Sequence, residues 1–178
     1  MQVQTVNSER KIAMAGRIEG AAGGSLAGKT VAVLGLAFKP DTDDVRESPS
    51  LTLIPMLQER GATVRAYDPH AHENAEPLLP GVAWCSSALE AAEKADVTVI
   101  VTEWNEFRAL DLDRLKASMR GDVLVDLRNV YLPAQARAAG FRYTRLGGSD
   151  ARKVLSARSG NEIVRSRRHR HEFHEGTC

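Results

Sequence analysis

Short apolar runs recur along most of this chain and are separated by more polar segments. The first covers residues 30–36 almost without interruption, and similar runs cover 63–67, 97–102, 123–127 and 141–146. Runs of this length are typical of strands that are buried on both faces of a parallel sheet. We therefore predict five strands at these positions.

The segments between the predicted strands carry helix signals. Ser48 and Pro49 supply an N-cap and a first-turn proline for a helix that Gly61 would end as a C-terminal cap. Ser87 and Glu90 have the spacing of a capping box. The remaining predicted helices lie at residues 87–95, 111–119 and 133–139. Strands alternating with helices indicate an α/β fold, a doubly wound parallel Rossmann-like sheet of five to six strands.

The two ends of the chain differ from this central pattern. Residues 2–19 have apolar positions at helical spacings, and the Gly-rich run 20–25 that follows is typical of a linker. After residue 149 there is no clean hydrophobic period, and Arg and His residues are dense, so we expect a disordered basic tail. The predicted division is a helix with its linker, a central domain and the tail, at residues 1–29, 30–149 and 150–178.

Composition narrows the possible functions. A length of 178 residues suits one ordinary domain, and a net charge of +1 gives no field that would attract nucleic acid or an anionic membrane. From residue 151 onward, seven Lys or Arg against three Glu give the tail +4 and leave −3 for the rest. Blocks of charge are usually solvated, so nucleic-acid binding is not expected. No apolar run approaches the ~20 residues of a membrane span, and the two cysteines suit a reducing compartment, so a cytoplasmic location is expected.

Three cations follow strands of the predicted sheet. Lys39 and Arg46 come after the first strand, and Arg128 comes after the run at 123–127. Parallel strands present their carboxyl ends at one edge, where α/β sheets bind ligands, so the three side chains are expected on one rim. Such cations suit a diphosphate, because Arg offers a planar fork and Lys a compact charge. The alternative is that they form solvated surface ion pairs with nearby acids: Asp41, Asp43, Asp44 and Glu47.

Other residues allow both a structural and a functional interpretation. Asp68, at the end of the second strand, could accept a ribose hydroxyl or could cap the local Asp-Pro turn. Cys85, before a predicted helix, is expected to be a packing residue and not a reactive thiol. The histidines of the tail could bind a metal, but solvated side chains are expected there, and no metal site is predicted: His169, His171 and His174.

Residues 35–48 resemble a known protein family. They match the pattern G-x-A-F-K-x-D-T-x-D-x-R-x-S of the UDP-glucose/GDP-mannose dehydrogenases at every specified position. Tyr67-Asp68-Pro69, Thr102-Glu103-Trp104 and Asp126-x-Arg128 follow in the family's order, and residues 6–10 resemble the end of the helix that joins its two domains. The chain is thus similar to the C-terminal UDP-binding domain of that family, and residues 1–29 would be a remnant of the inter-domain helix.

The resemblance implies a role for four of these side chains. Phe38, Lys39 and Arg128 would contact a UDP-sugar, and Arg46 would face NAD across the domain cleft; none would be catalytic. The family oxidises the C6 alcohol of the sugar to a carboxylate in two NAD-dependent steps, through a cysteine-linked thiohemiacetal. UDP-glucose is the expected substrate, while GDP-mannose and N-acetylated UDP-sugars remain open.

The resemblance also indicates what this sequence lacks. Neither the family's Gly-rich cysteine segment nor its G-x-G-x-x-G dinucleotide loop is present, since Gly35 stands alone. We therefore expect a fragment that is inactive in isolation and needs an NAD-binding domain or a separate chain supplying it. A homodimer through the joining helix is implied, with Val6 and Met14 on its apolar stripe. The alternative function is a stand-alone nucleotide-binding or oligomerisation module without catalytic activity.

Overall fold

A six-stranded parallel sheet forms the centre of the molecule. The computed structural model describes residues 2–147, which belong to one compact unit, Met1–Gly147. Within these residues the strand order is β3-β2-β1-β4-β5-β6, and all neighbouring strands are parallel. The strands are β1 (Thr30–Leu34), β2 (Thr63–Tyr67), β3 (Ala83–Trp84), β4 (Val97–Ile100), β5 (Val123–Asp126) and β6 (Arg142–Arg145). The predicted doubly wound α/β fold is confirmed.

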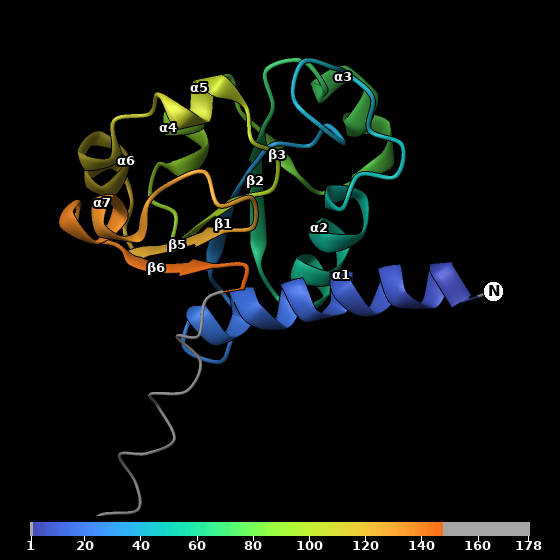
Figure 1. Ribbon diagram of the computed structural model, residues 1–178, viewed down its shortest axis with the longest axis horizontal. Helices are drawn as coiled ribbons and strands as arrows, with labels where there is room; N and C mark the ends of the chain where they lie inside the picture. The colour runs from blue at the N-terminus through green and yellow to red at the C-terminus, as the bar shows by residue number, and fades with distance from the viewer. Residues whose placement is uncertain (1, 148–178) are drawn as a thin grey trace, which may run out of the picture. The chain divides into compact units, whose positions relative to one another are not determined.

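Helices cover both faces of this sheet. Figure 1 shows α4, α6 and α7 on one side and α1 and α2 on the other. The helices are α1 (Gln2–Ala21), α2 (Ser50–Glu59), α3 (His72–Ala75), the 3-10 turn η1 (Glu76–Leu78), α4 (Ala88–Ala92), α5 (Asn105–Arg108), α6 (Leu112–Ser118) and α7 (Pro133–Ala138). None of the described helices is both long enough and apolar enough to span a membrane.

The apolar runs form strands because both faces of the sheet are covered. Every residue of β4 and β5 is buried, as are residues 31–34 of β1. Residues at the carboxyl ends of the central strands lie in register: Leu34 pairs with Tyr67 and Ile100, and Ile100 pairs with Asp126. The loops that follow these strands therefore begin at the same edge of the sheet.

Helix α1 packs against the central domain. It runs through Gly20 to Ala21, two residues beyond the predicted end and into the predicted linker. Ile18 is fully buried, and Glu19 lies 3.3 Å from Arg60 at the end of α2. The predicted disordered tail and its histidines lie outside the described residues.

Several local predictions differ from the structure. β3, α3 and α5 are absent from the sequence prediction because each has four residues or fewer. The predicted N-cap at Ser48 is wrong: α2 begins at Ser50 with Pro49 at the cap, although the Ser48 hydroxyl accepts a hydrogen bond from the Ser50 N–H at 3.3 Å. The C-terminal cap at Gly61 is confirmed, with φ +85° and the Ala62 N–H bonded to the Leu57 carbonyl.

The capping box at the start of α4 is half correct. The Ser87 hydroxyl accepts a hydrogen bond from the Glu90 N–H at 3.1 Å, as predicted. The Glu90 carboxylate accepts its own bonds from Ser86, from the N–H at 2.7 Å and from the hydroxyl, and not from Ser87. The carboxylate therefore closes the helix start one residue earlier than a standard capping box.

Candidate functional site

The topological switch point of the sheet lies between β1 and β4. The chain leaves β1 toward β2 and leaves β4 toward β5, so the two following loops lead away in opposite directions along the sheet. In α/β sheets, ligands bind beside such a point. Residues 35–49 form the loop after β1, and Thr102 to Trp104 follow β4. Arg128 follows β5, the next strand along. The candidate site is built from these three segments.

A close backbone approach fixes the start of the β1 loop. Gly35 has φ +95°, and a Cβ added there would lie 2.6 Å from the Thr102 Cβ. Only glycine fits this position without displacing the neighbouring loop. The Thr102 hydroxyl in turn donates a 2.7 Å hydrogen bond to the Ala37 carbonyl. This hydrogen bond joins the loop after β4 to the loop after β1 at the residue that precedes Phe38.

The carboxylate of Asp68 organises the same loops from the other side. The residue is only 4% exposed. Its Oδ2 accepts hydrogen bonds from the Leu36 N–H at 2.6 Å, the Ala37 N–H at 3.0 Å and the Trp104 indole N–H at 3.1 Å. Its Oδ1 accepts bonds from the N–H groups of His70 at 2.9 Å and Ala71 at 2.8 Å. Both oxygens therefore accept hydrogen bonds from the protein. The bonds from His70 and Ala71 fit the predicted turn role of Asp68, and the other three connect that turn to the loops after β1 and β4.

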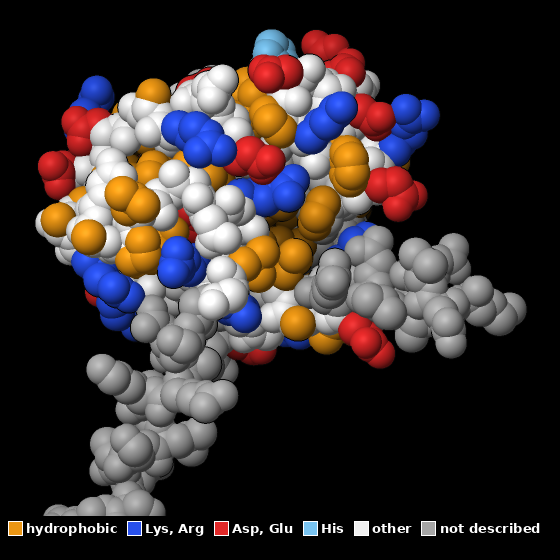
Figure 2. All heavy atoms as spheres, in the orientation of Figure 1, with side chains coloured by type: hydrophobic (Ala, Val, Ile, Leu, Met, Phe, Trp, Pro, Cys, Tyr) orange, Lys and Arg blue, Asp and Glu red, His pale blue; other side chains and the backbone are white. Residues whose placement is uncertain are grey.

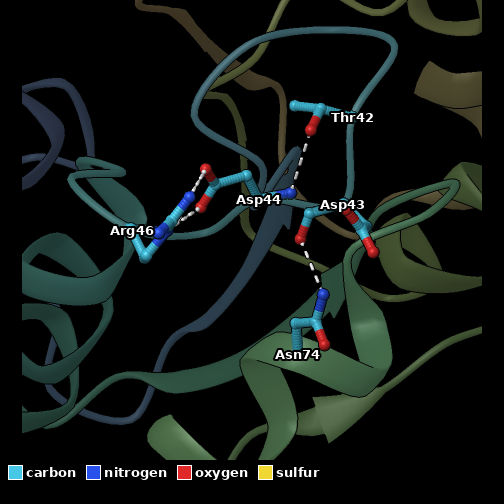
Figure 3. A network of polar contacts seen from close by, with 5 residues as sticks. All are labelled: Thr42, Asp43, Asp44, Arg46 and Asn74. Atoms are coloured by element: carbon cyan, nitrogen blue, oxygen red, sulfur yellow. Dashed lines mark hydrogen bonds and ion pairs between the residues drawn. The ribbon is translucent and has the colours of Figure 1, made fainter.

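The distal part of the β1 loop is closed by its own polar contacts. The Phe38 N–H donates to the Asp44 carbonyl at 2.8 Å. Figure 3 shows the Thr42 hydroxyl accepting from the Asp44 N–H, and the Asn74 amide of α3 donating to the Asp43 carbonyl at 3.0 Å. These bonds hold residues 38–44 as a defined loop beside α3.

Arg128 spans the switch point. Its Nε donates to the Val101 carbonyl at 3.0 Å, and its Nη2 donates to the Phe38 carbonyl at 3.2 Å. The Nε also lies 2.8 Å from Oε2 of Glu103. Because the guanidinium contacts the loops after β1 and β4 from its own loop after β5, it joins all three segments of the site.

The buried carboxylate of Asp126 positions the Arg128 segment. It accepts a hydrogen bond from the Arg128 N–H at 3.0 Å on one oxygen, and bonds from the Tyr131 N–H at 3.0 Å and the Tyr143 hydroxyl at 2.8 Å on the other. Burial, together with this carboxylate, raises the pKa of both tyrosine hydroxyls well above the usual value. The two tyrosines therefore stay neutral, and Tyr143 remains a donor to Asp126 across the ordinary pH range.

Lys39 and Arg46 lie on the exposed part of the β1 loop. The Arg46 side chain is 86% exposed and forms a two-pronged contact with Asp44, at 3.0 Å from Nε and 2.8 Å from Nη2 (Figure 3). The hydrogen bonds from Arg46 lower the pKa of Asp44 to about 2, and the exposed Lys39 adds to this effect through its charge. Figure 2 shows Lys or Arg side chains beside Asp or Glu side chains over this upper part of the molecule.

The four residues singled out in the sequence therefore divide into two groups. The guanidinium of Arg128 donates a hydrogen bond to the carbonyl of Phe38, and Lys39 is the next residue in the chain after Phe38. The Phe38 side chain is 47% exposed, which leaves a ring face for a ligand. Arg46 instead forms an exposed ion pair with Asp44, as predicted by the alternative in which the cations pair with nearby acids.

Two acidic residues of the site, Glu103 and Asp126, have structural roles that the sequence interpretation does not assign. For Asp68 the sequence interpretation gives the local turn but not the contacts with the loops after β1 and β4. Each follows or ends a strand at the ligand edge, which is the signal that could have identified Glu103 and Asp126 as partners of a nearby cation. The donors that Asp68 binds are 31 to 36 residues away in the chain at Leu36, Ala37 and Trp104, so spacing alone gives no sign of them.

Other candidate groups do not form a catalytic centre in the described part of the chain. Cys85 is buried, and burial raises the pKa of its thiol, so it is a packing residue. Among the described residues no group of three or more His, Cys, Asp or Glu side chains could hold a metal ion. An open depression of about 440 Å³ is lined by Asp41, Thr42, Asp43 and His70, and its acidic lining disfavours a phosphate.

Together, the parallel sheet and the cations that flank its switch point define a Rossmann-like α/β domain of the class that binds nucleotides at the carboxyl ends of its strands. Comparison with known proteins narrows this class. Residues 32–133 match the UDP binding domain of the UDP-glucose/GDP-mannose dehydrogenase family. The chain belongs to this family.

Individual relatives support the same assignment. The UDP-glucose 6-dehydrogenase of Rhizobium meliloti is 50% identical over 145 residues, which cover 82% of this chain and 33% of the relative. A UDP-glucose dehydrogenase structure from Pyrobaculum islandicum matches with a TM-score of 0.65 and 35% identity, over 80% of this chain and 30% of that one. An NDP-N-acetyl-D-galactosaminuronic acid dehydrogenase from Methanosarcina mazei matches with a TM-score of 0.65 and 27% identity, over 77% and 28%. The chain thus spans about a third of the length of the relatives it matches.

Proposed function

We propose that this chain binds the nucleotide part of a UDP-sugar at the switch point of its sheet. Lys39 and Arg128 are the diphosphate ligands, and the exposed ring of Phe38 contacts the nucleotide sugar. The observation that carries the proposal is the Arg128 hydrogen bond to the Phe38 carbonyl, which holds the guanidinium beside the loop that bears Lys39. Two cations from the loops after different strands then lie at the ligand edge of the sheet, and charge-assisted hydrogen bonds to phosphate are strong.

The proposed substrate is UDP-glucose. The support is that relatives with 50% and 45% identity are UDP-glucose 6-dehydrogenases. In the whole protein the bound sugar would be oxidised at C6 to the carboxylate in two NAD-dependent steps. Within that reaction, the residues of this chain bind and orient the nucleotide, and we propose no catalytic role for any of them. A cytoplasmic location remains a prediction.

The residues described here do not fit NAD at the β1 loop. A dinucleotide fold needs small residues after the first strand and a free acidic acceptor at the end of the second. Here Phe38 and Lys39 occupy the loop, and both oxygens of Asp68 are already hydrogen-bonded. We therefore propose that NAD is held mainly by another domain or chain and that the exposed Arg46 contacts it from this side. This chain alone is accordingly proposed to be inactive in oxidation.

Calorimetric titration of the chain with UDP-glucose tests the proposal. Lys39→Ala and Arg128→Ala should each weaken binding by roughly tenfold or more, because each removes a charge-assisted contact to phosphate. Arg46→Ala should leave the affinity for UDP-glucose unchanged, since Arg46 is assigned to the cofactor side.

Arg142→Ala is the matched control for Arg128→Ala. Arg142 also pairs with a carboxylate, that of Asp122 at 2.9 Å, but it lies at the amino end of β6, on the opposite edge of the sheet. Its removal should not change the affinity. Equal losses for Arg128→Ala and Arg142→Ala, or no heat with UDP-glucose for the unaltered chain, would refute the proposal.

A further inference from the structure

Arg128 carries two kinds of contact that have different consequences. The carbonyl oxygens of Val101 and Phe38 accept hydrogen bonds from its Nε and Nη2, and these contacts fix the orientation of the guanidinium plane. Glu103 adds a negative charge 2.8 Å from the same Nε. The carbonyls leave the cation with a net positive charge toward a ligand, whereas the carboxylate neutralises it.

The Glu103 contact is a poor hydrogen bond. The Nε proton is directed at the Val101 carbonyl, and Oε2 of Glu103 is a buried atom without a hydrogen-bond donor. The Oε2 atom of Glu103 is therefore attracted to Arg128 by charge alone. Without a hydrogen bond, the free energy that this oxygen loses on leaving water is only partly recovered. Glu103 is therefore not needed to orient Arg128, because the two carbonyls already do so.

A phosphate that reaches Arg128 must share it with Glu103. The Glu103 and Arg128 side chains are 30% and 34% exposed, so the pair is partly accessible to a ligand. Asp126 also contacts this segment, but its oxygens are engaged by the Arg128 N–H, Tyr131 and Tyr143. Glu103 is thus the carboxylate of this group whose charge is directed at the guanidinium itself.

We propose that Glu103 is an internal counterion of Arg128 that competes with the ligand's diphosphate and sets the affinity of the site. This inference rests on the proposed function, because it assumes that the diphosphate binds at Arg128. It assigns Glu103 as a determinant of selectivity: anions without further contacts are held weakly, and ligands that also contact the protein through uridine or sugar overcome the competition.

The test uses calorimetry with UDP, inorganic pyrophosphate and uridine at low ionic strength. Glu103→Gln keeps the shape of the side chain and removes its charge. UDP and pyrophosphate should bind this variant roughly twofold to fivefold more tightly, the range expected for a partly exposed charge pair, and uridine should bind unchanged. In an Arg128→Ala background, the same substitution should give a smaller gain than in the unaltered chain.

Asp122→Asn is the matched control, because Asp122 pairs with Arg142 on the opposite edge of the sheet. An equal gain for Asp122→Asn would show a general charge effect and overturn the inference. Weaker or unchanged UDP binding by Glu103→Gln, with normal binding by the unaltered chain, would show that Glu103 orients Arg128 or plays no part, and would overturn it as well. Absence of UDP binding by every variant would instead refute the proposed function, and this inference with it.

Discussion

Replacement of Asp68 by Asn is the most demanding test of how the rim of the sheet is assembled. The substitution keeps the size of the side chain and exchanges one carboxylate oxygen for an NH₂ group, which donates hydrogen bonds and cannot accept them. In the structure, all five groups around Asp68 are donors: four backbone N–H groups and one indole N–H. An asparagine therefore places a donor against donors in either orientation of its amide.

The expected loss of stability follows from this count of donors. In the less costly orientation, the amide oxygen replaces Oδ2, and the NH₂ group faces the N–H groups of His70 and Ala71. Two N–H groups then lose their acceptor: that of Ala71 is buried and that of His70 is partly buried. A buried unsatisfied group costs about 1–3 kcal/mol, so Asp68→Asn should reduce the free energy of unfolding by at least about 1–3 kcal/mol.

Urea unfolding followed by circular dichroism measures this difference. The matched control is Asp111→Asn, because Asp111 also accepts two backbone N–H bonds, from Asp113 and Arg114, but is exposed at the start of α6. Asparagine is as good an N-cap as aspartate, so the control should change stability by less than about 0.5 kcal/mol. A loss below about 1 kcal/mol for Asp68→Asn would refute the assignment of Asp68 as the centre that joins the three loops.

Three further predictions concern other parts of the structure. Gly35→Ala should destabilise the fold by about 2 kcal/mol or more in thermal unfolding, because of the positive φ and the missing space; an unchanged midpoint would contradict this. Burial and Glu106 raise the pKa of Tyr67 to about 12, so an ultraviolet titration should find its ionisation there, and the stability it contributes should be complete below pH ~10 and lost as the pH rises toward the folded-state pKa. Arg46→Ala should raise the pKa of Asp44 from about 2 toward 3.8 in a carboxylate NMR titration, and a pKa that stays near 2 would show that Arg46 is not its cause.

The sheet and its ligand edge could be predicted from the sequence because both depend on local patterns. The apolar runs at 97–102 and 123–127 leave few alternatives to buried parallel strands, and this topology places the residues after them on one edge. The positions of Lys39 and Arg128 relative to the sheet follow from the runs at 30–36 and 123–127, which they come after. β3, with two residues, gives no comparable pattern and is defined by its pairing with β2.

The detailed contacts of the structure were predictable in part, because some join neighbouring residues and others join distant segments. The partner of Arg46 is two residues away, and the sequence already offers Asp44 among its alternatives. The contact of Arg128 with the Phe38 carbonyl joins residues 90 positions apart, and no spacing rule predicts it. At the start of α4, the Glu90 carboxylate accepts hydrogen bonds from Ser86 and not from Ser87. The capping-box pattern gives the spacing of the residues but not the backbone geometry that decides between these two donors.

The central claim is that Lys39 and Arg128 bind the diphosphate of a nucleotide. Calorimetry that compares UDP with uridine on the same chain tests it most directly, because the two ligands differ only in the charged group. The unaltered chain should bind UDP much more tightly than uridine, and the Lys39→Ala/Arg128→Ala double variant should lose most of that difference while it keeps its affinity for uridine. Equal affinity of the unaltered chain for UDP and uridine, or a difference that persists in the double variant, would contradict the claim.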